Sequence, residues 1–440
     1  MMPFKKHLLT LFLLTCSVLA HAQQNNVITL QQCIDIAVKN NLEVKQTNNT
    51  MLVDSINYKQ SKENLLPSLT GNASRSLNQG RGVNSITNTY INQSFTNDSY
   101  GLNTGVTLFN GLALQNNIKQ ALLAYKAGKM DLQAAKDQVT INVITNYMAV
   151  LNAEETLLQT QSNLAVSKEV LERLEIQEQQ GNNKAASDIY DQRGIYATNK
   201  VNVVNAKNAL NAAKLSLFQL MNIAYQPDAE LQALNPAEPA ARYSLNPQQI
   251  YEIALQQLPQ IKAAILKRES AEKSLQMQKS RLFPTLTLGG SINTNYSSAS
   301  QNTSYFDQFK NNYATNIGLN LSIPLFTGHT QKNNIAIAKI SLNSYKDLQE
   351  NTRTVLLQNV EQTYYNMTAA QNRYLALQDA VKAYTESFRI SKIRFEAGVL
   401  TSVDFIISKN NVDAANLNLI TARYDYLIYS RMLDYYQGKL

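Results

Sequence analysis

Apolar residues spaced seven apart mark the two longest regular segments of the chain. The first series is Val143, Val150, Leu157, Leu164 and Leu171, and the second, 217 residues later, is Val360, Met367, Tyr374, Val381 and Phe388. Sustained heptads indicate helices packed side by side as in a coiled coil. The positions three residues further on are mixed (Ala153, Thr160, Ser167 and Leu174), so the predicted seam is narrow. A helix of about 70 residues is about 100 Å long, which favours a bridge across a compartment over a compact core.

A period of two residues precedes each of these helices. Small or apolar residues alternate with polar ones at 69–73 and 100–108, and again at 286–292 and 317–325. This period predicts strands, and a membrane strand needs about 9–11 residues. We expect a polar loop at about 76–98 in the first half. In the second half we expect a loop that follows Ile292 and runs to about 311. Such loops are too long for the tight turn of a soluble β-hairpin and are typical of the outer loops of a membrane barrel.

Four strands cannot close a barrel, and an open sheet edge in lipid would leave backbone groups unpaired. If these strands cross a membrane, several chains must share one barrel. Two chains would supply eight strands and three would supply twelve. Oligomerisation therefore follows from the pattern, whereas the number of chains does not.

The pattern occurs twice with one fixed offset. Ile34-Asp-Ile-Ala37 returns as Tyr251-Glu-Ile-Ala254, Leu66-Pro-Ser-Leu-Thr70 as Phe283-Pro-Thr-Leu-Thr287, and Leu108-Phe-Asn-Gly111 as Leu325-Phe-Thr-Gly328, while Tyr147 matches Tyr364 and Gly181 matches Gly398. A fixed period indicates an internal duplication. We predict a first repeat at 23–226, a connector at 227–247 and a second repeat at 248–440. Each repeat would hold a first helix (about 29–64 or 247–282), two strands and a long helical hairpin.

Glycines end both long helices, in Gln180-Gly181-Asn182 and Ala397-Gly398-Val399. A glycine just past a helix end supplies the left-handed cap. Ser187 with Asp188, and Ser402 with Asp404, offer N-cap side chains for the returning helices. The sequence therefore predicts two helical hairpins, each with a short tip loop at the end remote from the strands.

The first residues resemble a secretory signal peptide. Lys5 and Lys6 precede an apolar run at 8–14, and Ala20-His21-Ala22 offers a cleavage site, so residues 1–22 are expected to be removed. Two alternatives stay open, an uncleaved anchor and a lipoprotein acylated at Cys16. No later stretch reaches about 18 apolar residues, so no transmembrane helix is expected.

Composition argues against catalysis and against nucleic-acid binding. The formal net charge is +8, from 40 basic and 32 acidic residues, and it is spread along the chain without a basic stripe. Beyond residue 22, Cys33 and His329 are the remaining cysteine and histidine, so no internal disulfide, Cys/His metal cluster or histidine-based triad can be built. Neither a dinucleotide fingerprint nor a P-loop is present. We expect no catalytic residue, no cofactor and no bound metal.

Together these features resemble the TolC family of outer-membrane efflux proteins. The clearest stretch runs from Arg394-Phe-Glu-Ala-Gly398 through Thr401, Val403 and Asp404 into Ala422-Arg-Tyr-Asp-Tyr-Leu427. The resemblance covers about 27–437. It implies a mainly α protein with membrane β structure, in which tandem-duplicated coiled-coil helices carry four strands per protomer and three protomers complete a twelve-stranded barrel. It also implies a place in the outer membrane, with the helical part in the periplasm.

The same resemblance implies a function and partners. The chain would be the passive exit duct of a tripartite efflux or type I secretion system. It would form a homotrimer, contact outer-membrane lipid, and work with a periplasmic adaptor (membrane fusion protein) and an inner-membrane pump of RND, ABC or MFS type. Nucleic acid is not among the expected partners.

By the same resemblance, Gly181, Asn182, Gly398, Val399 and Leu400 belong to adaptor-contact tip turns, and Phe395 and Asp404 belong to a periplasmic gate. A ring of Asp404 carboxylates would attract cations; a plain N-cap is the alternative role. Phe395 and Leu400 stand where the best-known member has a tyrosine and an arginine that latch the entrance, and Ile407 replaces a second acidic ring. Because phenylalanine and leucine cannot make those hydrogen bonds, we predict closure by apolar packing more than by a polar latch.

Three other classes of protein compete with this interpretation. A periplasmic adaptor should carry compact β-domains around one hairpin, and a structural coiled-coil envelope protein would leave the strand alternation unexplained. An enzyme is disfavoured by the residue inventory. No motif identifies the cargo.

Overall fold

The computed structural model describes residues 27–83, 88–180, 186–234, 244–300 and 302–439. The expected leader with Cys16, and the tip residues Gly181 and Asn182, lie outside these ranges. The chain forms two compact units, and each draws on both halves of the sequence. The helical unit comprises the described parts of Met1–Thr47, Gln133–Leu258 and Thr354–Leu440, and the sheet unit comprises Asn48–Leu132 and Pro259–Arg353.

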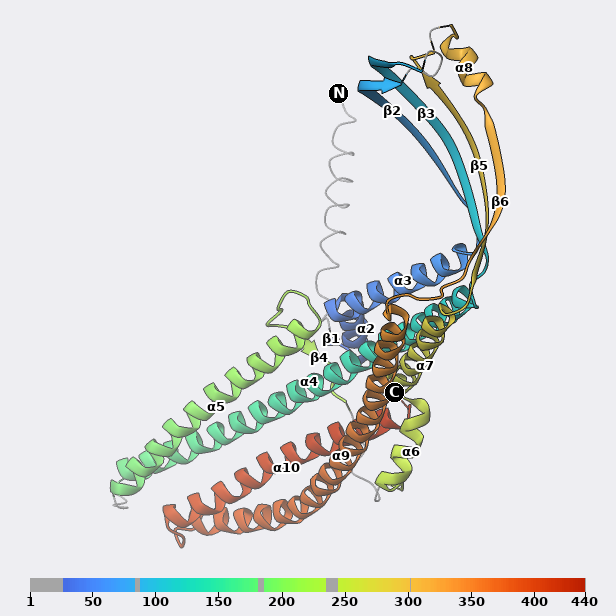
Figure 1. Cartoon of the computed structure of the whole chain (residues 1–440). Helices are drawn as coiled ribbons and strands as arrows, with labels where there is room; N and C mark the ends of the chain where they lie inside the picture. The colour runs from blue at the N-terminus through green and yellow to red at the C-terminus, as the bar shows by residue number, and fades with distance from the viewer. Residues whose placement is uncertain (1–26, 84–87, 181–185, 235–243, 301, 440) are drawn as a thin grey trace, which may run out of the picture. The chain divides into compact units, whose positions relative to one another are not determined.

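The sheet unit contains four antiparallel strands in the order β2-β3-β5-β6 (Figure 1). Their bounds are Ser68–Val83, Tyr90–Phe109, Thr285–Ser297 and Ala314–Ser322. The predicted strands are confirmed, but the predicted loop at 76–98 is wrong, because β2 and β3 stay paired out to Val83 and Tyr90. Asn, Ser and Gly predict loops when they are counted by composition. Here they alternate in register with larger residues and form one face of the ladder.

The two faces of this sheet differ in chemistry. Residues that pair directly across the strands share a face, and one such row joins Gly71, Leu102 and Ile292. Leu69, Ile317 and Leu319 lie on the same face and are 73%, 84% and 66% exposed. We call this the apolar face. An amphipathic sheet with this much exposed apolar surface requires an apolar environment.

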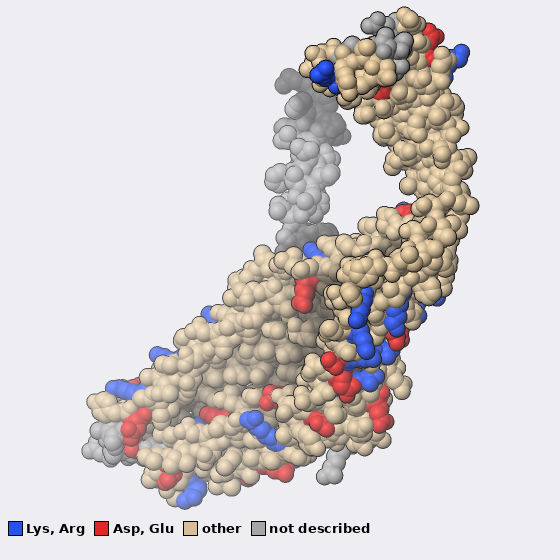
Figure 2. Space-filling model, viewed as in Figure 1, with Lys and Arg blue, Asp and Glu red and all other residues tan. Residues whose placement is uncertain are grey.

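The opposite face, the polar face, is built from Asn, Ser, Thr and Gly. Asn72, Gly101 and Asn293 pair across it, and the Asn103 amide donates to Asn72 Oδ1 at 2.8 Å. A Cβ at Gly101 would lie 2.7 Å from Asn293 Oδ1, so the amides leave no room for a side chain there. Among the described residues of β2, β3, β5 and β6 only Arg75, Arg81 and Asp98 are charged, and all three occupy the apolar-face register. Figure 2 accordingly shows most of the sheet's length without charge.

A short helix, α8 (Tyr305–Asn311), lies between β5 and β6. The sequence pattern placed a plain loop in this region, so that expectation is wrong. Ser304 caps the helix by accepting from the backbone N–H of Asp307 at 3.2 Å. Because a helix of two turns is too short to show a period, no sequence signal announced it.

A tight turn at Gly111, inside the sheet unit, joins β3 to the long helix that follows it. Its φ is +66°, and a Cβ would lie 2.4 Å from the carbonyl oxygen of Ser280, which ends α7 (Pro259–Ser280). Glycine is therefore required twice over, for the left-handed backbone and for the close approach. The second half repeats the turn at Gly328, where φ is +58°.

Each predicted first helix is split in two. The first half has α2 (Leu30–Asn40) and α3 (Leu42–Glu63), and the second has α6 (Pro247–Gln257) and α7. Leu258 precedes Pro259 and is extended, as the proline ring requires. At the other break the side chain of Asn41 accepts from the N–H of Val44 at 3.0 Å and so caps α3.

The long helices are confirmed as α4 (Ala113–Gln179) and α9 (Thr330–Glu396), with 67 residues each. In the helical unit they pair with α5 (Ala186–Leu220) and α10 (Ser402–Tyr436) as two hairpins (Figure 1). Val143, Val150, Val360 and Met367 of the heptad series are at most 1% exposed. The mixed seam also persists, because buried Ser167 donates to the carbonyl of its own helix at Leu164.

Near the other end of the helical unit, a two-residue parallel pair joins β1 (Val27–Ile28) to β4 (Glu230–Leu231). The fully buried Tyr147 lies beneath this pair, and its hydroxyl donates to the carbonyl of Gln232 at 2.7 Å and to that of Ile28 at 3.1 Å. Its repeat partner Tyr364 is half-buried, so the two halves are not equivalent here.

The element order is duplicated, since α2, α3, α4 and their counterparts α6, α7, α9 begin 217 residues apart. The compact units cut across this duplication, because each contains parts of both halves. The repeat boundaries 23–226, 227–247 and 248–440 remain a prediction from sequence.

Candidate functional site: the tip of the helical hairpins

The turn between α9 and α10 is closed by a glycine cap. Gly398 has φ +73° and its N–H donates to the carbonyl of Phe395, while the N–H of Val399 reaches back to that of Arg394 at 2.9 Å. This pair of bonds satisfies the last carbonyls of α9. The glycine cap predicted at Gly398 is confirmed, while the matching prediction at Gly181 falls outside the described residues.

The N-cap of α10 is Thr401, one residue before the predicted Ser402. Its side chain accepts from the N–H of Asp404 at 3.2 Å, and its hydroxyl donates to Asp404 Oδ2 at 2.7 Å. Asp404 is exposed and lies in the first turn, where a negative charge favours the helix N-terminus. Ser187 and Asp188 likewise lie inside the first turn of α5, which begins at Ala186, so neither of them is its cap.

Phe395 lies in an apolar cluster that joins the two hairpins of one protomer. Its ring stacks on Phe405 of α10 with centroids 4.6 Å apart and planes 18° apart. Leu171 and Leu174 of α4 and Ile189 of α5 complete the cluster, and Leu400 packs against it. The Phe395 side chain is 5% exposed, so the residue expected at the gate is held by apolar burial within its own chain.

Ion pairs surround this cluster. Arg173 of α4 donates to Glu396 at the end of α9 at 3.1 Å, and Arg193 of α5 contacts Glu175 of α4 at 2.9 Å. Their side chains are between 37% and 53% exposed, so each pair contributes about 0–1 kcal/mol. The cluster, not these ion pairs, holds the tip together.

A second tie between the hairpins lies further along α10. The Tyr424 hydroxyl donates to Glu155 Oε1 on α4 at 2.7 Å, and the Arg423 guanidinium pairs with the other oxygen of the same carboxylate. Tyr424 is 4% exposed, and burial with the hydrogen-bonded carboxylate holds the pKa of its hydroxyl well above the usual value. The sequence singled out Arg423 and Tyr424 by resemblance but missed Glu155.

A buried charge pair lies between that tie and the tip. The Lys409 ammonium pairs with Asp413 one turn further along α10, and it also donates to Asn163 of α4 at 3.2 Å. Burial raises the pKa of the Asp413 carboxyl, while the Lys409 hydrogen bond opposes that rise. No residue of this group follows a motif, so sequence spacing gave no signal for it.

Two properties of the described residues concern membrane-spanning helices and metal binding. None of the helices covered by the described ranges is both long and apolar enough to cross a membrane. In the same ranges, no group of three or more His, Cys, Asp or Glu side chains is placed to hold a metal ion.

The sequence of the chain is similar to those of known proteins. The model of a family described as outer membrane efflux protein matches residues 33–222 and 250–439. The chain is 25% identical over 354 residues to the toxin and drug export protein A of Aggregatibacter actinomycetemcomitans, covering 77% of this chain and 73% of that protein. It is 28% identical over 327 residues to the outer membrane protein TolC of Salmonella enteritidis, with 71% and 64% covered.

A solved structure is similar over nearly the whole chain. Superposition on the CmeC outer membrane channel of Campylobacter jejuni gives a TM-score of 0.81 at 18% identity, covering 93% of this chain and 86% of that one. At that identity the likeness concerns the fold. It confirms the predicted fold class of long duplicated helices with a small set of strands.

Proposed function

Since the chain belongs to the outer membrane efflux protein family, we propose that it is the passive exit duct of a three-component export system. The strands lie in the outer membrane and the helical hairpins reach into the periplasm. Cargo would be driven by an inner-membrane pump of the RND, ABC or MFS type, through a periplasmic adaptor. The chain itself supplies a path and no chemistry.

The observation that carries this function is the two-faced sheet. Its apolar face exposes Leu69, Ile317 and Leu319 as lipid contacts, whereas its polar face offers Asn72 and Asn293 to water. Amide and hydroxyl groups without formal charge allow solutes of either sign to pass. That pairing of faces fits the wall of a water-filled conduit.

The sheet's edges support assembly into a trimer. β2 and β6 are the outer strands of the sheet, and within the described residues neither has a strand on its second side. Unpaired backbone groups are too unfavourable in lipid to remain exposed. Neighbouring protomers would therefore pair β2 with β6, and three copies would close a barrel of twelve strands.

The tip supports the adaptor contact. Gly398 and Val399 protrude from the end of the second hairpin, and Val399 is 69% exposed. A turn capped in this way holds its exposed residues in a fixed position, which favours a contact with another protein. Leu400 faces the cluster more than solvent, so within the turn Val399 would bear the larger share of the contact.

Outer-membrane isolation tests the function directly. We expect an oligomer that resists SDS, dissociates on heating and conducts ions in a planar bilayer. A soluble periplasmic monomer would refute the proposal.

The same bilayer assay tests the gate. Phe395→Ala removes the ring that stacks on Phe405 and should raise the conductance of the closed state, because the entrance is held by apolar packing. Phe218→Ala is the matched control, since Phe218 is also buried (1% exposed) but lies against Tyr225 outside the tip cluster. An unchanged closed state in Phe395→Ala would count against apolar closure.

Asp404→Asn should lower the preference of the channel for cations and leave the conductance of the closed state as it is.

A further inference from the structure

The short helix α8 is fixed to the apolar face of the sheet by several hydrogen bonds. Thr294 of β5 donates through its hydroxyl to the carbonyl of Phe309 at 2.6 Å. The buried Gln308 accepts from the N–H of Ser297 at 2.9 Å and donates to its carbonyl at 3.1 Å. The Phe309 ring meets the edge of Tyr100 with centroids 5.8 Å apart. A seven-residue helix would not hold this position by its own propensity, so these contacts define it.

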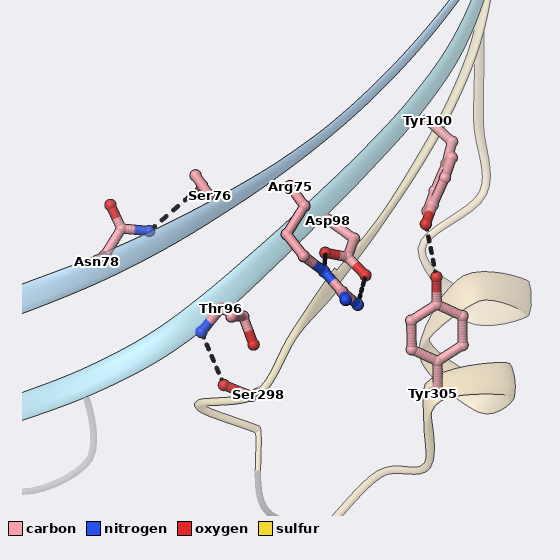
Figure 3. A network of polar contacts seen from close by, with 8 residues as sticks. All are labelled: Arg75, Ser76, Asn78, Thr96, Asp98, Tyr100, Ser298 and Tyr305. Atoms are coloured by element: carbon pink, nitrogen blue, oxygen red, sulfur yellow. Dashed lines mark hydrogen bonds and ion pairs between the residues drawn. The ribbon is translucent and has the colours of Figure 1, made fainter.

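A charged pair lies on the same face, next to a pair of tyrosines formed by Tyr100 of β3 and Tyr305, the first residue of α8 (Figure 3). Asp98 is fully buried and accepts two hydrogen bonds of 2.7 Å from the Arg75 guanidinium. Next to it, the hydroxyl oxygens of Tyr100 and Tyr305 are 2.8 Å apart. The Arg75 side chain is 69% exposed, so its remaining N–H groups still face outward while Asp98 fixes the guanidinium in place.

The sheet and α8 together enclose an open groove of about 510 Å³. Its floor is low because β2 contributes the small residues Gly71 and Ala73. Leu102 and Ile292 of the sheet, Phe309 of α8 and Tyr313 after it also line the groove. Most of its lining residues lie on the apolar face, and Asn72, Gly101 and Asn293 of the polar face also line it. Its volume falls within the range of small-molecule sites, about 300–1,000 Å³.

Two basic residues follow lining residues of this groove along the chain. Arg75 follows the lining residue Ala73 on the same face of β2, and Lys310 follows the lining residue Phe309 on α8 and is exposed. Phe306 of α8, 81% exposed, and Tyr313, 58% exposed, are aromatic side chains of the kind that gather at headgroup depth. The groove thus has a mainly apolar lining, and basic residues follow two of its lining residues in the sequence.

We propose that this groove binds one acyl chain of a phosphate-bearing lipid of the outer leaflet, with the phosphate held by Arg75 and Lys310. The charge complementarity selects the phosphate, and the low floor at Gly71 and Ala73 admits the chain. Binding at this one height fixes the depth of the sheet in the bilayer. The proposal rests on the outer-membrane location proposed above.

Lipid retention tests the proposal on the intact oligomer. The purified protein is placed in phosphatidylcholine vesicles with lipid A, a phosphorylated glycolipid, or with an uncharged glycolipid, and retained lipid is counted by native mass spectrometry. We expect lipid A to be retained over the uncharged glycolipid. Ala73→Phe fills the groove and should lower retention about tenfold, whereas Leu69→Phe, on the same face outside the groove, should leave it unchanged.

The phosphate contact has its own variant, which leaves the folded sheet untouched. Lys310→Gln should lower lipid A retention about fivefold, the equivalent of one lysine near an anionic lipid, while Lys346→Gln on α9 should not. If conductance shows that the duct is intact, either of two results would overturn the proposal. One is equal retention of both glycolipids, and the other is wild-type retention of lipid A by Ala73→Phe or Lys310→Gln. Absence of conductance and of an SDS-resistant oligomer in the wild type would instead overturn the function on which it rests.

Discussion

Removing the Tyr424 hydroxyl should ease the separation of the two hairpins. Tyr424→Phe deletes the hydrogen bond to Glu155 Oε1, which is 2.7 Å long, and keeps the buried ring in place. A hydrogen bond to a charged group contributes about 1.5–3 kcal/mol. The Glu155 side chain is 35% exposed, so water replaces part of the bond and we take the lower end, about 1.5 kcal/mol. That corresponds to about a tenfold shift in any equilibrium that moves α10 away from α4.

The assay is single-channel recording of the purified oligomer. If the entrance opens by moving α10 away from α4, the ratio of open to closed time should rise about tenfold in Tyr424→Phe. Tyr426→Phe is the matched control on the same helix, because the pKa of Tyr426 is raised by burial and by the Asp434 charge rather than by a hydrogen-bonded carboxylate. Glu155→Gln combined with Tyr424→Phe should give less than the sum of the single effects, because the two groups act together. A change below about twofold in Tyr424→Phe would refute the reasoning, since it would mean that α4 and α10 stay together during opening.

Three further predictions concern stability and reactivity. Burial is the main cause that raises the pKa of Asp137 above its ordinary value of 3.8. The contribution of the Asp137 carboxyl to the free energy of unfolding is therefore complete below pH 3.8 and is lost as pH rises through the raised pKa. Asp137→Asn should therefore raise the melting temperature at neutral pH and leave it unchanged in acid; a parallel shift at all pH values would contradict this. Gly111→Ala should abolish the oligomer in outer-membrane extracts, because φ is +66° and the new Cβ would meet the carbonyl oxygen of Ser280. Gly194→Ala is the control: Gly194 lies inside α5 with open space around it, so the substitution should add about 1 kcal/mol of stability. The Cys33 thiol is fully buried and its pKa is raised to about 11, so maleimide should label it after unfolding and not before; rapid labelling of the native oligomer would disprove that burial.

Periodicity carried the sequence predictions that succeeded. The heptads predicted the helical state of α4 and α9, because a repeat over many turns is the pattern of a long helix. The glycine cap at Gly398 was also readable, since few residues adopt its backbone conformation. These features are local, and their physical cause lies within a few residues of chain.

Features that depend on distant partners were not readable. The loop expected at 76–98 is strand, because pairing with β3 outweighs the low strand propensity of Asn and Gly. Glu155 meets Tyr424 across 269 residues of sequence, so neither position marks the other. Phe395 was singled out as a gate residue only through a family resemblance, and its place in one cluster with Leu171 and Phe405 came from the fold.

The pairing of β3 with β5 has a consequence for how the protein reaches its native state. Asn97 of β3 pairs with Ser297 of β5. These two paired positions in the middle strands of the sheet are therefore about 200 residues apart in the sequence. At a synthesis rate of about 5–20 residues per second, β3 would precede its partner by roughly 10–40 s. Contacts of such long sequence separation form slowly and leave apolar strands open to aggregation meanwhile. Until β5 arrives, the edge of β3 that pairs with β5 in the native sheet is therefore open to other partners.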